Sequence, residues 1–192
     1  TGKKDIKILT QSDLSISAFM LPKVEDSALI SELPDINIIA LLETPKSIKN
    51  ISDIASENKV KGLALGGADM SASLGSTMDW DSLLYARSKI VLEAAINGLF
   101  TIDSPFMNIE DLNALLKESK KAKDLGFNGK AAIHPSQLEV IKSSFLPSDE
   151  EILEAREIIS AFNQSAAAVI SFRGRMIDQT LILSMETKYL KT

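Results

Sequence analysis

The chain of 192 residues has no cysteine and a single histidine. Disulfides are excluded, nothing requires an oxidising compartment, and a metal site with two histidine ligands is impossible. No apolar run approaches the roughly 20 residues that span a bilayer, and no signal peptide is visible. The formal net charge of −5 comes with no long basic run, which argues against a nucleic-acid surface. We therefore expect a cytoplasmic protein that binds neither membrane nor nucleic acid.

What is present is enough apolar content, 45%, to bury a core. Short apolar runs bounded by turn residues, with helical segments between them, are typical of the parallel strands of an α/β protein. We expect strands at residues 18–21, 36–42, 62–65, 99–102 and 130–133. An amphipathic stretch over residues 5–14 precedes them.

Helix boundaries are marked by local signals. Thr44 offers an N-cap with Pro45 at the first helical position. A long amphipathic helix over residues 81–97 is ended by Gly98, and the next helix, which carries Leu112, Leu115 and Leu116, is ended by Gly126.

The rhythm changes after about residue 146. Ser148 and Glu151 have the spacing of a capping box at the head of a helix that runs to Phe162. An extended apolar stretch at 166–172, a break at Arg173-Gly174-Arg175 and a last helix with Leu181, Ile182, Met185 and Tyr189 follow. We expect residues 1–145 to form the α/β part and residues 146–192 a helical appendage that packs on it or on a neighbouring subunit.

Two carboxylates come where a buried strand opens into a loop. Glu43 follows the strand at residues 36–42, and Asp69 follows the next strand through Gly66-Gly67-Ala68. Chemistry in parallel α/β folds sits at the carboxyl ends of the strands. Two acids from adjacent strand ends can converge on one hard cation, with water or substrate oxygens completing an octahedron. Although one such acid alone more often caps a helix, the pair favours a metal site.

Five βα units suit either an open doubly wound sheet or part of a (β/α)₈ barrel. A full barrel typically needs about 250 residues, so length alone favours the open sheet. No Gly-x-Gly-x-x-Gly follows any expected strand, so a dinucleotide-binding fold has no direct support.

Seven motifs spread from Leu21 to Asp178 carry a resemblance to a known family. In order and spacing they are similar to successive strand ends of the HpcH/HpaI aldolase and citrate lyase β-subunit family. The motifs are Leu21-Pro22-Lys23-Val24-Glu25, Leu42-Glu43-Thr44, Gly66-Gly67-Ala68-Asp69-Met70-Ser71-Ala72-Ser73-Leu74-Gly75, Tyr85-Ala86-Arg87-Ser88, Ile102-Asp103, Gly129-Lys130-Ala131-Ala132-Ile133-His134-Pro135-Ser136-Gln137 and Gly174-Arg175-Met176-Ile177-Asp178. The later half resembles the citrate lyase β and malyl-CoA lyase branch.

The resemblance implies a (β/α)₈ barrel that binds Mg²⁺, or alternatively Mn²⁺, and cleaves a CoA thioester of the citryl-CoA or malyl-CoA type. The products would be acetyl-CoA and a 2-oxo acid. The family's metal-binding carboxylates correspond to Glu43 and Asp69. Mg²⁺ chelated by the 2-oxo acid acts as a Lewis acid and a template, and cationic or amide donors stabilise the enolate. A homo-oligomer, trimeric or hexameric, is also implied.

The chain departs from the family before Leu21. Members usually carry three further strands there, with an Asp-Leu-Glu-Asp segment and an arginine that grips the substrate carboxylate. The five expected strands would match the fourth to the eighth. A fragment is the first explanation, because Thr1 is not an initiator; a short paralogue, or a second chain that completes the barrel, stays open.

Asp178 lies in the appendage, about 40 residues past the last expected strand. In malyl-CoA lyase-like members the aspartate of the similar Met-Ile-Asp motif reaches a neighbouring subunit's active site, where it is implicated in proton transfer. The resemblance therefore makes Asp178 a candidate catalytic residue. The alternative is a favourable charge near a helix N-terminus.

Five other residues are also candidates, and each has a structural interpretation beside any functional one. Lys23 is either a Schiff-base nucleophile, which needs desolvation, or a solvated or salt-bridged lysine. His134 is a general base, a CoA contact or a hydrogen-bonded structural imidazole. Asp103 either lines the pocket or caps the next helix. Arg87 is expected in a salt bridge, and Trp80 is expected as a packed loop anchor rather than a cofactor platform.

Two other function classes stay open. One is a non-catalytic or truncated lyase-like subunit that binds a partner or a CoA ligand. The other is a metal-dependent aldolase acting on pyruvate and aldehydes without CoA, because residues 67–73 resemble that branch equally closely.

Overall fold

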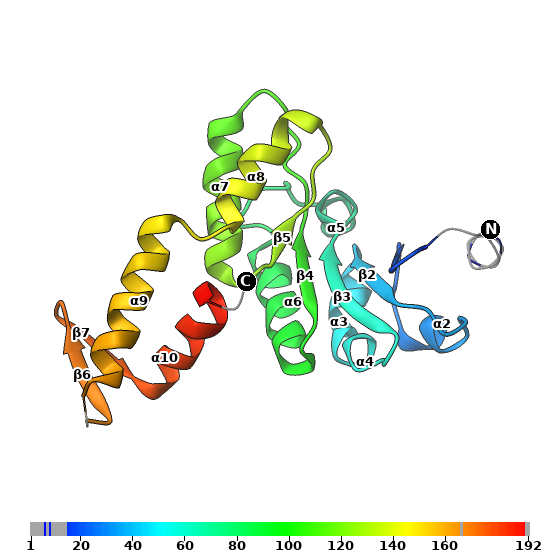
Figure 1. Ribbon diagram of the computed structural model, residues 1–192. Helices are drawn as coiled ribbons and strands as arrows, with labels where there is room; N and C mark the ends of the chain where they lie inside the picture. Colours follow the sequence, from blue (N-terminus) through cyan, green and yellow to red (C-terminus); the bar gives the residue numbers. More distant parts are fainter. Residues whose placement is uncertain (1–5, 7, 9–14, 166, 191–192) are drawn as a thin grey trace. The chain divides into compact units, whose positions relative to one another are not determined.

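The computed structural model describes residues 6, 8, 15–165 and 167–190 and divides into two compact units, Thr1–Phe145 and Leu146–Thr192 (Figure 1). The amphipathic stretch expected over residues 5–14 lies, except for Ile6 and Ile8, outside the described residues. Among the helices of the described part, none is long and apolar enough to cross a membrane.

A five-stranded parallel sheet is the centre of the first unit. Its strands are β1 (Phe19–Leu21), β2 (Ile38–Leu42), β3 (Val60–Leu65), β4 (Phe100–Asp103) and β5 (Gly129–Lys130), and their order in the sheet is their order in the chain. A doubly wound sheet would reverse its strand order at a switch point, whereas a (β/α)₈ barrel adds each strand beside the preceding one. The expected α/β fold of the barrel type, with five βα units, is therefore confirmed, and the open-sheet alternative is wrong.

Helices connect these strands and follow the last one. They are α2 (Ser27–Ser31), α3 (Pro45–Lys49), α4 (Ile51–Ala55), α5 (Gly67–Leu74), α6 (Leu84–Asn97), α7 (Leu112–Leu125), η1 (Pro135–Gln137) and α8 (Leu138–Phe145). The helix ends at Gly98 and Gly126 are confirmed, with φ of 65° and 115°, the left-handed region that glycine enters without strain. Thr44 caps α3 as expected, but the following helix is broken at Asn50, whose Nδ2 donates to the Glu25 carbonyl at 2.8 Å.

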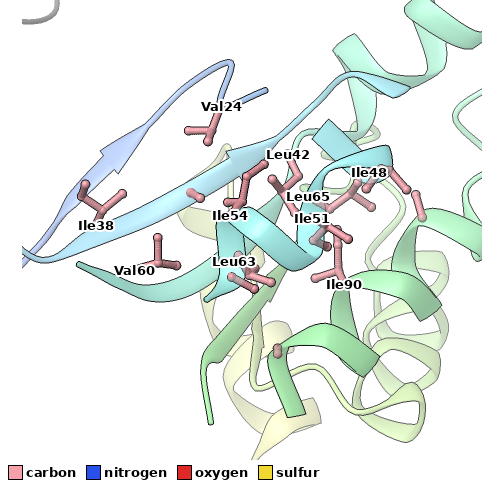
Figure 2. Close-up of a cluster of buried hydrophobic side chains, with 14 of the residues drawn as sticks. Val24, Ile38, Leu42, Ile48, Ile51, Ile54, Val60, Leu63, Leu65 and Ile90 are labelled. Carbon is pink, nitrogen blue, oxygen red and sulfur yellow. The ribbon is translucent and has the colours of Figure 1, made fainter. Parts of the chain in front are cut away.

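The core of the first unit lies between β2 and β3 and the helices that follow them. Alternate residues of β2 are buried, among them Ile38 and Leu42. Figure 2 shows Leu42 and Leu65 from the sheet close to Ile51 of α4 and Ile90 of α6. The pairing of β2 with β3 shifts register between Ile38 and Ile39 and is regular from Ile39 to Leu42, so the carboxyl ends of both strands are packed supports for the residues that follow.

Strand β5 is shorter than the expected run of residues 130–133. The N–H of Ala131 still donates to the Asp103 carbonyl at 2.9 Å, but the N–H of Ile133 donates to Gln137 Oε1, also at 2.9 Å. The chain therefore leaves the sheet after Ala131 and enters η1, with Pro135 in the first turn of that helix.

The second unit contains α9 (Asp149–Asn163), the antiparallel hairpin β6 (Val169–Phe172) and β7 (Arg175–Asp178), α10 (Gln179–Met185) and η2 (Glu186–Leu190). The capping box of Ser148 and Glu151 is confirmed. The expected break at residues 173–175 is a two-residue turn in which Arg173 and Gly174 both have positive φ, 49° and 78°. The last helix continues beyond Met185 as the wider π-helix η2.

Candidate active site

A pocket of about 280 Å³ lies where the carboxyl ends of the strands meet. Its apolar walls include Met20, Leu41, Ile102, Pro105 and Ala131. The acidic residues lining it are three: Glu43, Asp69 and Asp103. The structure therefore brings together the two carboxylates that the sequence selected, and it places Asp103 in the same pocket, which confirms the pocket-lining interpretation of that residue.

Glu43 is the first residue after β2 and is only 5% exposed. Its Oε1 accepts a hydrogen bond from the backbone N–H of Lys23 at 2.8 Å. Lys23 has a φ of 53°, which is uncommon for a residue with a side chain. In this backbone conformation its N–H points at the Glu43 carboxylate. The N–H fixes one carboxylate oxygen, which leaves Oε2 for the pocket.

The pKa of Glu43 is raised above its usual value. Burial is the largest cause, and the negative charge of Asp69 and a side-chain interaction with it act in the same direction. The Lys23 N–H opposes the rise because it stabilises the ionised form. The two carboxylates are thus close enough to repel each other.

Asp69 lies in the first turn of α5, and its side chain is exposed. The turn before it, Gly66-Gly67, brings the end of β3 against the end of β2: the Gly66 N–H donates to the Leu42 carbonyl at 3.0 Å. A Cβ at Gly66 would lie 2.5 Å from Glu43 Cβ and 2.8 Å from Glu43 Oε2. Only glycine permits this approach, which places both carboxylates at one pocket.

Asp103 is held by two buried cations. Arg87 Nε donates to its Oδ1 at 2.8 Å, and Lys130 Nζ donates to its Oδ2 at 2.7 Å. Lys130 also pairs with Glu118 at 2.7 Å. The salt bridge expected of Arg87 is confirmed. The helix-capping alternative for Asp103 is wrong, because α7 is capped by Asp111.

The contacts of the remaining candidates, His134, Lys23 and Trp80, favour structural over catalytic roles. His134 Nδ1 accepts from the Ser136 N–H at 3.2 Å and caps η1, as the structural interpretation expects. Lys23 is exposed, so the desolvation that a Schiff-base lysine needs is missing. Trp80 packs against the core, and Arg87 lies over its ring at 4.4 Å, which confirms the loop anchor.

Asp178 belongs to the second unit, where it is the N-cap of α10. Its Oδ1 accepts a hydrogen bond from the Leu181 N–H at 2.9 Å. Within its own chain, Asp178 therefore places a favourable negative charge at the N-terminus of a helix, as the alternative interpretation expected.

Sequence reasoning missed three contacts around the site: the Lys23 backbone N–H on Glu43, the hydroxyl of Ser104, which accepts from Arg87 Nη2 at 3.3 Å, and the cation of Lys130 on Asp103. A lysine inside the expected strand at residues 130–133 was a signal for the last of these, because a buried ammonium requires a carboxylate partner. The other two contacts have no sequence signal.

Comparison with known proteins places this geometry in a family. The family model described as HpcH/HpaI aldolase/citrate lyase matches residues 1–135. Mitochondrial citramalyl-CoA lyase of Homo sapiens is 34% identical over 94% of this chain, and citrate lyase subunit beta of Leuconostoc mesenteroides is 29% identical over 94% of it. The chain spans 62% and 66% of the lengths of these two relatives.

A solved structure has the same fold. The crystal structure of CitE from Mycobacterium tuberculosis in complex with magnesium, acetoacetate and coenzyme A superposes with a TM-score of 0.86 and 29% identity, covering 96% of this chain and 71% of that one. The chain therefore belongs to the HpcH/HpaI aldolase/citrate lyase family.

Proposed function

We propose that the protein is a Mg²⁺-dependent carbon–carbon lyase that cleaves a β-hydroxyacyl-CoA thioester of the citryl-CoA or malyl-CoA type into acetyl-CoA and a 2-oxo acid. The observation that carries the proposal is the pair Glu43 and Asp69 at one pocket, beyond the carboxyl ends of adjacent strands. Relatives named for citramalyl-CoA and for citrate, and the CitE complex with magnesium and coenzyme A, support it.

The pair has the donor chemistry of a magnesium site. Mg²⁺ prefers oxygen ligands, is commonly bound through one or two carboxylates and keeps several waters. Among the described residues neither Glu43 nor Asp69 forms a salt bridge, whereas Asp103, the third acid of the pocket, is paired with Arg87 and Lys130. No three protein ligands of the described part are arranged to enclose an ion by themselves, so water or substrate would have to complete the coordination. Burial, and after it the negative charge of Asp69, raise the pKa of Glu43, and a bound cation would offset both effects by stabilising the ionised carboxylate. Glu43 and Asp69 would hold the ion, or Mn²⁺ in its place, with open positions for water and substrate oxygens.

Bound Mg²⁺ would supply Lewis acidity and a template for the carboxylate and keto oxygens of the 2-oxo acid. The chain's own residues prepare the site. The Lys23 N–H orients Glu43, and Gly66 lets it approach the Asp69 loop. The apolar side chains of Leu41, Ile102 and Pro105 line the same pocket, and with substrate bound they would limit the access of water and so strengthen electrostatic interactions with the developing enolate.

Asp178 is the proposed proton-transfer residue, acting in the site of a neighbouring subunit of a homo-oligomer. The resemblance of Met176-Ile177-Asp178 to the malyl-CoA lyase motif supports this role. Mixing Asp178→Asn protein with Asp69→Asn protein tests it, because some mixed oligomers would contain one intact site and recover activity. Absence of recovery despite demonstrated subunit exchange would exclude a shared site. A trimeric or hexameric assembly and a cytoplasmic location belong to the same proposal.

The metal assignment is tested by calorimetric titration of Mg²⁺ and Mn²⁺ into the protein, the Asp69→Asn variant and an Asp79→Asn control. Asp79 is an exposed aspartate in the loop before α6, outside the pocket. We expect Asp69→Asn to abolish measurable binding because it removes half of the carboxylate charge, and Asp79→Asn to retain it. Equal affinity in all three proteins would refute the site.

The reaction is tested with citryl-CoA, malyl-CoA and citramalyl-CoA, following acetyl-CoA and the 2-oxo acid. We expect metal-dependent cleavage of at least one thioester, lost in Asp69→Asn. Metal binding without cleavage would indicate the non-catalytic alternative. Activity that does not depend on the CoA moiety would indicate the pyruvate aldolase.

A further inference from the structure

The helix that carries Asp69 rests on a neighbouring strand end. Gly67, the first residue of α5, lies so close to Ser104 that an added Cβ would be 2.8 Å from Ser104 Oγ and 2.9 Å from Met78 Cε. Ser104 follows β4 directly and is fully buried, while Met78 lies in the loop between α5 and α6. The first turn of α5 therefore takes its position from the end of β4 and from this loop.

One buried side chain joins both supports. Arg87 of α6, 1% exposed, donates from Nη2 to Ser104 Oγ at 3.3 Å and from Nη1 to the Trp80 carbonyl at 3.2 Å. Its Nε bonds Asp103, and its guanidinium stacks on the Trp80 ring. The planar guanidinium has donors for three separate acceptors at once, which an ammonium cannot match in this geometry.

We infer that Arg87 and Ser104 are positioning residues for Asp69. Arg87 fixes Ser104 and the Trp80 loop, these two fix the first turn of α5, and α5 presents Asp69 to the pocket that Glu43 also lines. The inference rests on the proposed metal role of Glu43 and Asp69. Partners beyond the direct ligands commonly change metal affinity by about 10–100-fold, although they never touch the ion.

Lys130 provides a matched comparison inside the same cluster. It bonds the other oxygen of Asp103 at 2.7 Å and is as deeply buried as Arg87. Its second partner is Glu118, which also lies 3.9 Å from Arg87 Nη2, and not Ser104 or the Trp80 loop. We therefore expect loss of Lys130 to weaken the ion cluster and leave α5 in place. Loss of Arg87 should weaken the ion cluster and also release α5.

The experiment measures the Mn²⁺ dissociation constant and the melting temperature of the protein and of the Arg87→Lys, Ser104→Ala and Lys130→Met variants. We expect Arg87→Lys to weaken Mn²⁺ binding by about 10–100-fold, since the positive charge remains but the planar set of guanidinium donors is lost. Ser104→Ala should weaken it in the same direction with a smaller change in melting temperature. Lys130→Met should lower the melting temperature but keep the Mn²⁺ affinity within about twofold of the parent. This change is well below the roughly 10–100-fold loss that follows when a residue supporting a metal ligand is replaced.

Each outcome decides between the inference and its alternatives. If Arg87→Lys fails to fold, Ser104→Ala carries the test, because it leaves the ion pairs intact. Parental Mn²⁺ affinity in folded Arg87→Lys or in Ser104→Ala would overturn the positioning role, and so would an equal loss of affinity in Lys130→Met. Mn²⁺ binding by the parent that does not depend on Asp69 would instead refute the proposed function.

Discussion

Replacing Gly66 by alanine tests directly whether the close approach of two strand ends makes the site. Gly66 has a φ of −90°, which alanine also adopts, so the backbone conformation is not the obstacle. The obstacle is Glu43, whose Cβ would lie 2.5 Å and whose Oε2 would lie 2.8 Å from the new methyl group. The first contact involves a backbone-attached atom, so no rotation of the Glu43 side chain removes it.

The magnitude follows from these distances. Two carbon atoms pack at about 3.5–4.0 Å, so the end of β2 must move by about 1 Å relative to Gly66. Overpacking of this kind costs about 1–3 kcal/mol, which corresponds to about 2–4 °C of Tm for each kcal/mol in a chain of this length. A functional constellation must be held within about 0.5 Å, so Mn²⁺ affinity should fall by about 10-fold or more.

Gly98→Ala is the matched control. Gly98 ends α6 with a φ of 65° and has nothing within 4 Å of an added Cβ, so the substitution costs only the strain of a left-handed alanine, about 1–2 kcal/mol. Thermal unfolding and Mn²⁺ titration are measured on both variants. We expect similar losses of Tm but a loss of affinity only in Gly66→Ala. Unchanged affinity in Gly66→Ala would refute the argument that this contact positions Glu43.

Three further predictions concern single residues. Burial, and then the charge of Asp69, raise the pKa of Glu43, so the folded state holds the proton of this carboxyl more tightly than the unfolded chain does. The stability that this proton contributes is fully present below the usual pKa of 4.5 and is lost as the pH rises through the raised pKa of the folded state. In metal-free melting experiments over this pH range, Glu43→Gln should not lose stability as the pH rises, and it should be more stable than the parent above the raised pKa. Parallel profiles of Tm against pH for the two proteins would contradict this. Lys23→Gly should keep Mn²⁺ affinity and raise the unfolding free energy by up to about 1 kcal/mol, because glycine tolerates a φ of 53° and retains the N–H; a lower Tm would contradict the strain argument. Ser148→Ala should cost about 1 kcal/mol by removing the α9 cap, with Mn²⁺ affinity unchanged, as urea unfolding and titration would measure.

Much of the fold could be predicted because its causes are local. A short apolar run bounded by turn residues predicted β2, observed at Ile38–Leu42, and the same reasoning located β3 and β4 within two residues. Thr44 and Ser148 predicted helix starts, because a hydroxyl cap needs only the next three residues. Glu43 and Asp69 were selected by their places after strands, and their lining of one pocket is a consequence of parallel topology.

Local patterns failed where a distant group decided the backbone. The helix expected after Thr44 breaks at Asn50, whose side chain bonds Glu25, 25 positions earlier. Strand β5 stops at Lys130, and the expected run beyond it turns away toward Gln137. The second unit contains an antiparallel hairpin where the sequence predicted only an extended stretch and a break.

The sequence by itself therefore determined the α/β class, the family and the two acids at adjacent strand ends. Only the tertiary structure decided the state of each acid. Glu43 is held by the N–H of Lys23, 20 positions away, whereas Asp103 is neutralised by Arg87 and Lys130 from two other elements. Both are buried carboxylates that follow or end a strand, and they look alike in the sequence. A carboxylate's charge and availability depend on the donors within a few ångströms of it, and the fold brings those donors from distant parts of the chain.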